Sequence, residues 1–418
     1  MDNTLKKNSF RIVGLVSLLV LFIALANCPI TNVYAADTKE ILVGGLLPFT
    51  GTNAAWGTRQ DNGIRLMINK INREGGIKSL GGAKLKYVTA DTESKPEIAQ
   101  SQAEKLAAQG VKVVLGCNQS SSVITATQVL ERKKIPLINA NDFDPLITSR
   151  GFKYIFRTVP IMRDIANMLL IYAQEMNKEH KTNFRNVGIL CEDSVTGDGA
   201  AKALAQYTKK IGYNLTDMVL YDATTTKDFT PVLSGFKAKG VDLFVGHNKP
   251  ADSIQIVRNA KEVGFNPALL GGISGGWIAP EFPVNLGSLT ENIIVSAQED
   301  PGDTVGKFKE IKDEYFKLYK EEITSTAIQG VTAMWVLYTS LERAASTDTT
   351  AIAISIRKTD IKYGEGYYFQ QFGCKFDENG DNLRAGASIS QFKGGVRTVV
   401  FPDNSGKTKS IWPKPKFQ

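Results

Sequence analysis

Two hydrophobic patterns alternate along the first part of the chain. Short apolar runs at 41–47, 85–90, 111–116 and 135–139 are typical of strands that are covered on both faces. Between the first two runs, Ile64, Ile68 and Ile71 lie at helical spacing, and Gly75 and Gly76 end the pattern, which predicts a helix over 55–73. Pro96 opens a second predicted helix that Gly110 closes, and a third covers 121–133.

The same alternation resumes after residue 160. It predicts helices at 163–178, 199–211, 229–239 and 251–263, and strands at 187–191, 215–221, 241–246 and 268–271. Strands that alternate with helices of this length imply parallel sheets with right-handed crossovers. So many strands exceed one open sheet of ordinary size. We therefore predict an α/β fold with two doubly wound parallel-sheet lobes, divided near 156–161.

The last third of the chain has a different pattern. Apolar spacing predicts two long amphipathic helices at 303–320 and 327–345. From Tyr367 onward the chain is rich in Gly, Asp and Phe, which is typical of hairpin strands and turns. We expect the end of the chain, at 412–416, to be extended, because two prolines stand among its residues.

The N-terminus has the pattern of an export signal. Three basic residues, Lys6, Lys7 and Arg11, precede an uncharged apolar run at 12–26, which is too short to span a bilayer comfortably. Small or permissive residues at Val33 and Ala35 provide a cleavage site, so residues 1–35 are predicted to be a secretory signal peptide. Two alternatives stay open: an uncleaved membrane anchor, and a lipid anchor at Cys28, although Asn27 is a poor residue before a lipidated cysteine.

Export would place the mature protein in an oxidising compartment. Only Cys117, Cys191 and Cys374 follow the predicted signal peptide. The sequence allows one disulfide with a leftover thiol, or three buried thiols, and does not decide between them.

Charge and histidine content exclude some functions. The 50 basic and 42 acidic residues give a net charge of +8. Without residues 1–35, 47 basic and 41 acidic residues remain, a net charge of +6. The lysines are scattered, whereas a nucleic-acid binder usually gathers them in one stripe. The chain has only two histidines, which argues against a histidine-rich metal site and limits acid–base catalysis. We expect no cofactor, no metal and no nucleic-acid partner.

The loop at 116–122 is the most informative candidate site. It follows a buried strand, opens a helix and contains Ser120, Ser121 and Ser122. Free N–H groups at a helix N-terminus, together with serine hydroxyls, can bind an anion such as a carboxylate. The plainer interpretation is an N-cap, but a cap needs only one serine. We therefore favour contact with a ligand.

A second loop, at 139–145, follows the next strand. In parallel α/β sheets, ligands bind at the carboxyl ends of strands. Asn141 and Asp142 could be ordinary turn residues, and Phe143 and Trp56 could be core residues. Because several loops of this kind converge at one sheet edge, we predict a cleft that holds a ligand.

These loops also carry a resemblance to a known family. The chain resembles the branched-chain amino-acid (leucine/isoleucine/valine) type solute-binding proteins of ABC importers, and the matching segments are Gly45–Gly51, Trp56-Gly57, Ile71–Ile77, Ser120–Ser122, Asp144–Thr158, Thr196–Gly199, Lys227–Thr230 and Phe376–Asp381. The matches spread over residues 41–385.

The resemblance implies a type I periplasmic-binding fold, in which two lobes joined by three crossings close on a ligand. By analogy the crossings lie near 157–161, 295–300 and 362–368. The expected domains are the signal peptide at 1–35, a first lobe of 36–158 plus 299–364, and a second lobe of 159–298 plus 365–418.

The resemblance also implies ligand contacts. The first-lobe contacts of the family fall on Trp56, Ser120, Asn141 and Phe143, and its second-lobe aromatic position falls on Thr196. The full predicted ligand set is Trp56, Ser120, Ser121, Asn141, Asp142, Phe143, Thr196, Asn248 and Ser274. The family usually has tyrosine at the first position, small or hydroxylic residues at the third and fourth, an aromatic near Thr196 and a carboxylate near Ser274. Since this chain departs at each, an aromatic acid or an amide fits as well as an amino acid.

We therefore predict an exported, monomeric substrate-binding protein that delivers a small solute to an ABC permease. One alternative is a ligand-sensing receptor module of the same fold. Another is a secreted enzyme that uses Cys191 and His247 as a nucleophile pair, but no orienting motif surrounds these residues.

Overall fold

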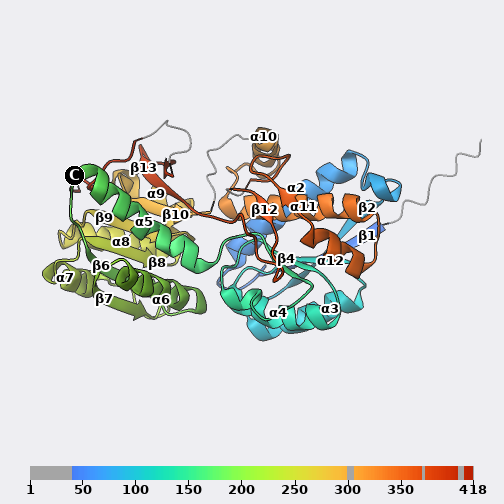
Figure 1. Ribbon diagram of the computed structural model, residues 1–418, viewed down its shortest axis with the longest axis horizontal. Coiled ribbons are helices and arrows are strands. Elements are labelled where there is room, and N and C mark those ends of the chain that lie inside the picture. The colour runs from blue at the N-terminus through green and yellow to red at the C-terminus, as the bar shows by residue number, and fades with distance from the viewer. Residues whose placement is uncertain (1–39, 299–305, 370–371, 403–408, 418) are drawn as a thin grey trace, which may run out of the picture. The chain divides into compact units, whose positions relative to one another are not determined.

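The computed structural model describes residues 40–298, 306–369, 372–402 and 409–417 (Figure 1). They form two large sheets, each with helices on both faces, which confirms the predicted α/β fold with two lobes. The predicted signal peptide, including Cys28, lies outside the described residues. None of the helices in the described ranges is long and apolar enough to cross a membrane.

The first lobe contains a parallel sheet in the order β2-β1-β3-β4-β5. Its strands are β1 (Glu40–Leu47), β2 (Lys84–Asp91), β3 (Val113–Gly116), β4 (Leu137–Asn139) and β5 (Ile155–Arg157). Its helices are α2 (Ala54–Arg73), α3 (Pro96–Ala108), α4 (Ser120–Arg132), α10 (Phe308–Tyr319), α11 (Ser325–Ala344) and α12 (Thr349–Arg357).

Alternating side chains of strand β1, which lies between β2 and β3, are buried on both faces of this sheet. Ile41 and Val43 belong to an apolar cluster with residues of α2 and α11, whereas Leu46 belongs to a cluster with residues of α3 and α4. Successive side chains of a strand point to opposite faces, so a strand covered on both sides is apolar throughout. This explains the continuous apolar runs in the sequence.

Two glycines let α2 and α11 pack closely. A Cβ atom at Gly63 would lie 2.0 Å from the carbonyl oxygen of Ala327, and one at Gly330 would lie 2.4 Å from that of Gln60. Both distances are too short for any side chain. The close packing fixes the N-terminal turn of α11 beside the N-terminal half of α2.

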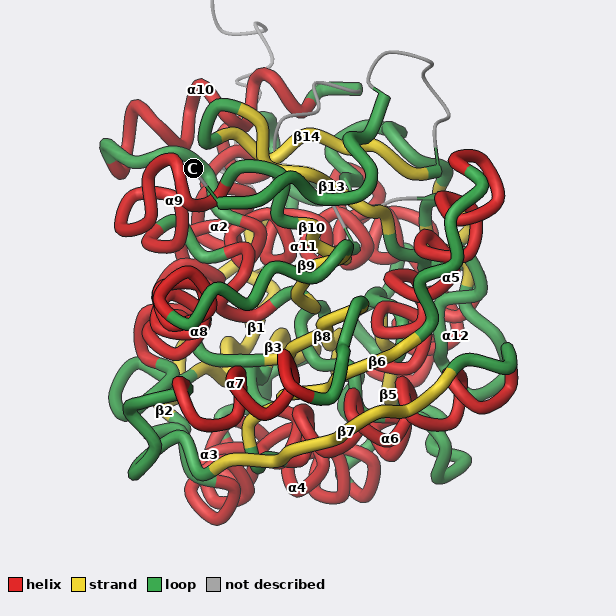
Figure 2. Tube along the Cα trace, turned by 90° about the vertical axis from the view of Figure 1, so that its left-hand side faces the viewer, coloured by secondary structure: helices red, strands yellow, loops and turns green. Residues whose placement is uncertain are grey.

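The second lobe, which is nearer the viewer in Figure 2, contains a sheet in the order β14-β13-β10-β9-β8-β6-β7. Its strands are β6 (Asn186–Glu192), β7 (Asn214–Tyr221), β8 (Leu243–His247), β9 (Leu269–Ile273), β10 (Ile294–Ala297), β13 (Ser388–Lys393) and β14 (Val396–Phe401). Its helices are α5 (Met162–His180), α6 (Val195–Lys210), α7 (Thr230–Ala238), α8 (Pro250–Glu262) and α9 (Glu281–Leu286).

This sheet is also covered on both faces. Val187 and Ile189 of β6 pack with α5 and α6, and Leu190 packs with α7 and α8. The strands from β7 to β10 are parallel, whereas β13 and β14 add an antiparallel hairpin at one edge. The hairpin agrees with the turn-rich composition of the tail. In the final segment Trp412 packs edge-on against Tyr172 and Phe184 of the second lobe.

The sheets define where the chain passes between the lobes. The first crossing runs from β5 to α5, and the second runs from β10 to α10 and includes residues 299–305, which lie outside the described residues. The third crossing differs from the prediction. Tyr368 and Phe376 still pack in the first-lobe core, and Ala387 is the next core residue of the second lobe. The chain therefore crosses at about 377–387 rather than at 362–368.

A short antiparallel pair explains this difference. Strands β11 (Asp360–Ile361) and β12 (Cys374–Lys375) pair beside the first lobe, and Tyr367, Phe369 and Cys374 pack in its core. The Asn382 side chain then donates hydrogen bonds to the carbonyl oxygens of Thr158 (2.8 Å) and Gly373 (2.9 Å). The start of the third crossing is thus bonded directly to the first.

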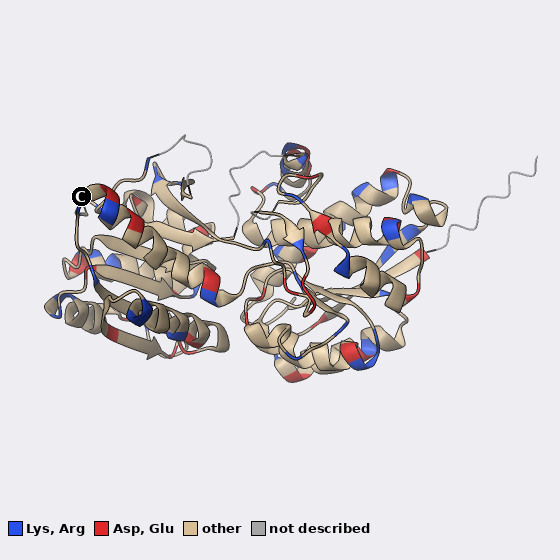
Figure 3. Ribbon diagram, viewed as in Figure 1, with Lys and Arg blue, Asp and Glu red and all other residues tan. Residues whose placement is uncertain are grey.

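Charged side chains are spread over the helices of both lobes, as the scattered lysines in the sequence indicate (Figure 3). The three cysteines in the described residues, Cys117, Cys191 and Cys374, are all buried free thiols. Of the two arrangements that the sequence allowed, the structure has three buried thiols.

Candidate ligand-binding site

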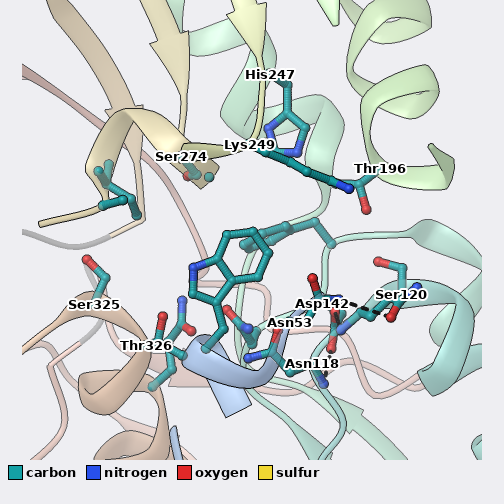
Figure 4. Close-up of a pocket in the computed structure, with 18 of the residues that line it drawn as sticks. Asn53, Asn118, Ser120, Asp142, Thr196, His247, Lys249, Ser274, Ser325 and Thr326 are labelled. Atoms are coloured by element: carbon teal, nitrogen blue, oxygen red, sulfur yellow. Dashed lines mark hydrogen bonds between the residues drawn. The ribbon is translucent and has the colours of Figure 1, made fainter. Parts of the chain in front are cut away.

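A cavity of about 340 Å³ lies where the strand ends of the two sheets face each other. Its size is in the range of small-molecule sites. The first lobe contributes Thr52, Asn53, Trp56, Arg59, Asn118, Gln119, Ser120, Ser121, Asn141, Asp142, Phe143, Thr324, Ser325, Thr326 and Gln329; the second contributes Glu192, Ser194, Val195, Thr196, His247, Lys249, Ser274, Gly275, Ile278, Ala279, Pro280 and Gln298. Figure 4 shows polar residues of both lobes around this cavity.

The first-lobe wall begins at the loop after β3. Gln119 precedes α4 and makes no side-chain cap bond to it. Ser120 and Ser121 begin the helix and line the cavity. The first N–H groups of a helix have no intrahelical partner, so this helix end offers donors to the cavity.

Asp142 occupies part of the predicted anion site. Its carboxylate accepts hydrogen bonds from the backbone N–H groups of Asn118 (3.1 Å) and Gln119 (2.6 Å), next to the start of α4 (Figure 4). Only 4% of the residue is exposed. Burial raises the pKa of the Asp142 carboxyl to about 7, although the Gln119 N–H and the charge of Arg157 oppose this rise. Asp142 lines the cavity, but its oxygens are engaged in holding the loop.

The two predicted aromatic contacts differ in their surroundings. Trp56, in the first turn of α2, is half-buried and lines the cavity. Phe143 also lines it but is only 8% exposed and packs in the second-lobe cluster with Val159 and Met162. Its carbonyl oxygen accepts a hydrogen bond from the Met162 N–H (2.9 Å). Phe143 thus contributes to the core near the first crossing, whereas Trp56 presents more of its surface to the cavity.

Other predicted residues complete the wall. Asn141 lies in a turn in which Asn139 Oδ1 accepts the N–H groups of Asn141 (3.0 Å) and Asp142 (3.1 Å). Thr196 is half-buried in the first turn of α6. The Ser274 hydroxyl donates to Gln298 Oε1 at 3.3 Å. All three line the cavity.

Asn248 is the predicted site residue that the structure places elsewhere. It is 1% exposed and absent from the cavity wall. Its amide donates to the carbonyl oxygen of Leu190 (3.0 Å) and accepts from Trp277 Nε1 (2.9 Å). Both bonds join elements within the second lobe. The Asn248 side chain therefore has a structural role in the second lobe, and the cavity gives no support to the prediction that it contacts the ligand.

Replacing Asn248 with alanine should lower the free energy of unfolding by about 2 kcal/mol, because it leaves buried polar groups of Leu190 and Trp277 without partners. Chemical denaturation measures this loss. Ligand affinity at 10 °C should change less than about twofold, since the side chain does not line the cavity. A large loss of affinity with unchanged stability would contradict the structural role.

Several cavity residues were missed in the sequence. Glu192, His247 and Lys249 stand at or just after the ends of β6 and β8. Because ligands of parallel α/β sheets bind at the carboxyl ends of strands, these residues could have been predicted. Thr324, Ser325 and Thr326 come from the start of α11 and carried no such signal, because only the packing of α11 on α2 brings them there.

His247 and Cys191 lie on paired strands, but their surroundings do not resemble a nucleophile pair. One ring nitrogen of His247, Nδ1, lies 2.8 Å from the carbonyl oxygen of Ile273, so this nitrogen carries the proton. Burial raises the pKa of the Cys191 thiol to about 12, although a backbone hydrogen bond from His247 opposes the rise. The reactive thiolate is therefore scarce at neutral pH. Among the residues with described positions, no three His, Cys, Asp or Glu side chains group as metal ligands.

One ion pair joins the two lobes beside the cavity. Arg59 Nη2 of α2 lies 3.1 Å from Glu281 Oε1 of α9. Arg59 lines the cavity, and Glu281 follows the lining residue Pro280. This contact stabilises the arrangement in which the lobes face each other closely.

Replacing Arg59 with alanine should favour separation of the lobes and raise the Kd of a ligand by about twofold to fivefold, as expected for loss of a partly exposed ion pair. Isothermal titration calorimetry measures the affinity. The double variant Arg59→Glu/Glu281→Arg should recover most of it at low salt. Equal losses in the single and the exchanged variants would show that the pair does not stabilise closure.

Comparisons with known proteins agree with this geometry. The family described as periplasmic binding protein matches residues 40–382. The Leu/Ile/Val-binding protein homolog 7 of Brucella suis is 24% identical over 395 residues, covering 91% of this chain and 96% of the relative.

Two solved structures share the fold. The branched-chain amino acid substrate-binding protein LivJ of Streptococcus pneumoniae, in complex with isoleucine, has a TM-score of 0.74 at 22% identity over 90% of this chain and 100% of its own. A solute-binding protein of an ABC transporter from R. palustris, in complex with benzoate, has a TM-score of 0.73 at 16% identity over 86% of this chain and 95% of its own. Proteins of this fold thus hold ligands as different as isoleucine and benzoate.

Proposed function

Because the chain belongs to the periplasmic binding protein family, we propose that it is the extracytoplasmic substrate-binding protein of an ABC importer and captures an amino acid or a related small organic solute. The observation that carries this proposal is the cavity lined by both lobes. A ligand that contacts both walls binds the closed arrangement better than the open one. It therefore shifts the protein toward closure without being changed itself.

The composition of the cavity supports a compact solute with an apolar body and polar ends. Trp56, Ile278 and Pro280 provide apolar surface, and Ser120 and Thr196 provide hydroxyl groups on opposite lobes. We propose that Trp56, Ser120, Ser121, Asn141, Phe143, Thr196 and Ser274 contact the ligand. Amino acids, aromatic acids and amides all have this combination, and the likeness to proteins that hold isoleucine and benzoate supports including the first two.

The role of a substrate-binding protein also implies where the protein is located. We propose that residues 1–35 are removed as a signal peptide and that the mature protein works outside the cytoplasm as a monomer. Its macromolecular partner would be the membrane permease of the importer. The buried state of the Cys191 thiol supports a binding rather than a catalytic role.

A thermal-shift screen of the protein lacking residues 1–35 tests the proposal. The screen should include amino acids, amides and aromatic acids. A bound ligand should raise the midpoint of unfolding by an amount that grows with the logarithm of the ratio of its concentration to its Kd. Small-angle X-ray scattering with that ligand should show a smaller radius of gyration, because the lobes close. Absence of any stabilising compound, together with turnover of one of them, would contradict a binding protein.

A further inference from the structure

The charged side chains around the cavity differ in whether they already have partners. Arg59 is paired with Glu281, and both oxygens of Asp142 accept backbone hydrogen bonds. Glu192 Oε1 accepts a hydrogen bond from the Ser194 hydroxyl (3.1 Å), whereas its buried Oε2 has no hydrogen-bond partner among the described residues. Arg59 and both oxygens of Asp142 are therefore engaged within the wall, and Glu192 is engaged through one oxygen only.

Lys249 is different. It lines the cavity as the residue before α8, is half-buried, and its ammonium group has no hydrogen bond or ion pair within the described ranges. Its charge acts on Asp252, but that carboxylate accepts the Tyr221 hydroxyl at 2.9 Å and is not paired with Lys249. In Figure 4 the Lys249 side chain extends from its strand end toward Thr196.

An unpaired ammonium group in a partly desolvated cavity favours an anion. Taking a charge out of water is unfavourable unless an opposite charge or strong hydrogen bonds replace the water, and lysine is a common partner of carboxylates. The other anion site, at the start of α4, lies beside the carboxylate of Asp142, which accepts the N–H groups of Asn118 and Gln119 just before the helix. A second carboxylate there would be repelled by the first.

We propose that Lys249 binds a carboxylate of the ligand, so that the second lobe holds the acid end of the solute while its apolar body lies against Trp56 of the first lobe. This inference rests on the proposed function and narrows it to organic carboxylates. Two kinds of solute carry this group: a simple acid with an aromatic body, and an amino acid through its α-carboxylate. The single ammonium group and the neighbouring Glu192 and Asp142 favour a monocarboxylate over a polyanion.

Matched pairs of acid and amide test the charge contact directly. Calorimetric titrations with benzoate and benzamide, and with L-leucine and L-leucinamide, should show at least one acid bound about tenfold or more tightly than its amide, as a charge-assisted hydrogen bond provides. Binding of benzoate alone assigns a simple acid, and binding of leucine alone assigns an amino acid. Lys249→Met should weaken that acid about tenfold and leave the Kd of its amide within about twofold.

Lys239→Met is the matched control, because Lys239 lies on the second lobe in an exposed ion pair with Asp217 (2.6 Å) and does not line the cavity. It should leave the preference for the acid unchanged. Equal weakening of acid and amide by Lys249→Met would overturn the proposal, as would loss of the preference in Ser120→Ala instead. If amides bind and neither acid does, the carboxylate assignment fails while the proposed function stands. The proposed function itself fails only if no compound of the wider thermal-shift screen binds and one of them is turned over.

Discussion

Replacing Arg157 with methionine should lower the free energy of unfolding by about 3 kcal/mol, because the change removes a buried charge that several groups share. Arg157 ends β5 and has no solvent exposure. Its guanidinium pairs with Asp381 and donates to the Thr148 hydroxyl (3.1 Å) and to the carbonyl oxygen of Asp144. Without it, these acceptors lose their donor. The loss should stay near the lower limit for broken buried pairs, since the Asp381 side chain is 33% exposed and water can reach it.

The position of Arg157 gives this variant a second effect. Asp381 lies at the start of the third crossing, and the Arg157 N–H donates to the Gly380 carbonyl oxygen at 2.8 Å beside the first crossing. The side-chain pair therefore reinforces the contact between two connections of the lobes. We expect small-angle X-ray scattering of Arg157→Met to show a broader distribution of interatomic distances, because the two lobes are less restrained relative to each other.

Guanidinium denaturation of the protein lacking residues 1–35 measures the change in stability. Arg163→Met is the control, since Arg163 has a 61% exposed side chain paired with Asp164 and its loss should cost less than about 1 kcal/mol. Arg157→Lys should be intermediate, because it keeps the charge but loses the forked geometry. If Arg157→Met and Arg163→Met unfold at the same denaturant concentration, the buried pair does not stabilise the fold.

The sequence predicts the repeating part of the fold well because the same physical pattern recurs there. Apolar runs covered on both faces become strands, and segments with one apolar face become helices, as at β1 and α2. Predictions fail where the strand–helix alternation stops or where elements depend on distant contacts. The missed strands β5 and β10 are as short as the predicted strands β3 and β4, but each of them leads into a crossing between the lobes, where the alternation is interrupted.

The third crossing shows the same limit. Its place depends on the β11–β12 pair and on Asn382, which bonds to Thr158 more than two hundred residues earlier in the chain. Local propensity contains no information on such a contact. The family resemblance suggested a position, but it was about one element too early.

The candidate site follows from one rule more than from any motif. Residues placed after strands β1, β3, β4, β6 and β9 reach the cavity because the carboxyl ends of parallel strands share an edge. This position at the strand ends predicts which loops reach the cavity, but it does not predict the direction in which each side chain points. After β8 it led to Asn248, which points into the second lobe, whereas the next residue, Lys249, lines the cavity.

Replacing Trp56 with alanine should raise the Kd of the ligand about thirtyfold or more, the largest effect on binding that we expect of any single change, because large aromatic side chains dominate binding sites. Trp56 is half-buried, lines the cavity, stands in the first turn of α2 and belongs to none of the apolar core clusters of the described residues. Its loss should therefore leave the unfolding temperature without ligand nearly unchanged. Calorimetric titration with a compound found in the thermal-shift screen measures the affinity.

Trp56→Phe and Phe143→Leu separate the roles of the two aromatic residues. Trp56→Phe keeps an aromatic face and should retain more affinity than Trp56→Ala. Phe143 is buried in the second-lobe cluster, so Phe143→Leu should lower the unfolding temperature more than either Trp56 variant does. A marked fall in the unfolding temperature of Trp56→Ala would instead identify Trp56 as a core residue. In that case the apolar surface for the ligand would have to come from Ile278, Ala279 and Pro280 of the second lobe.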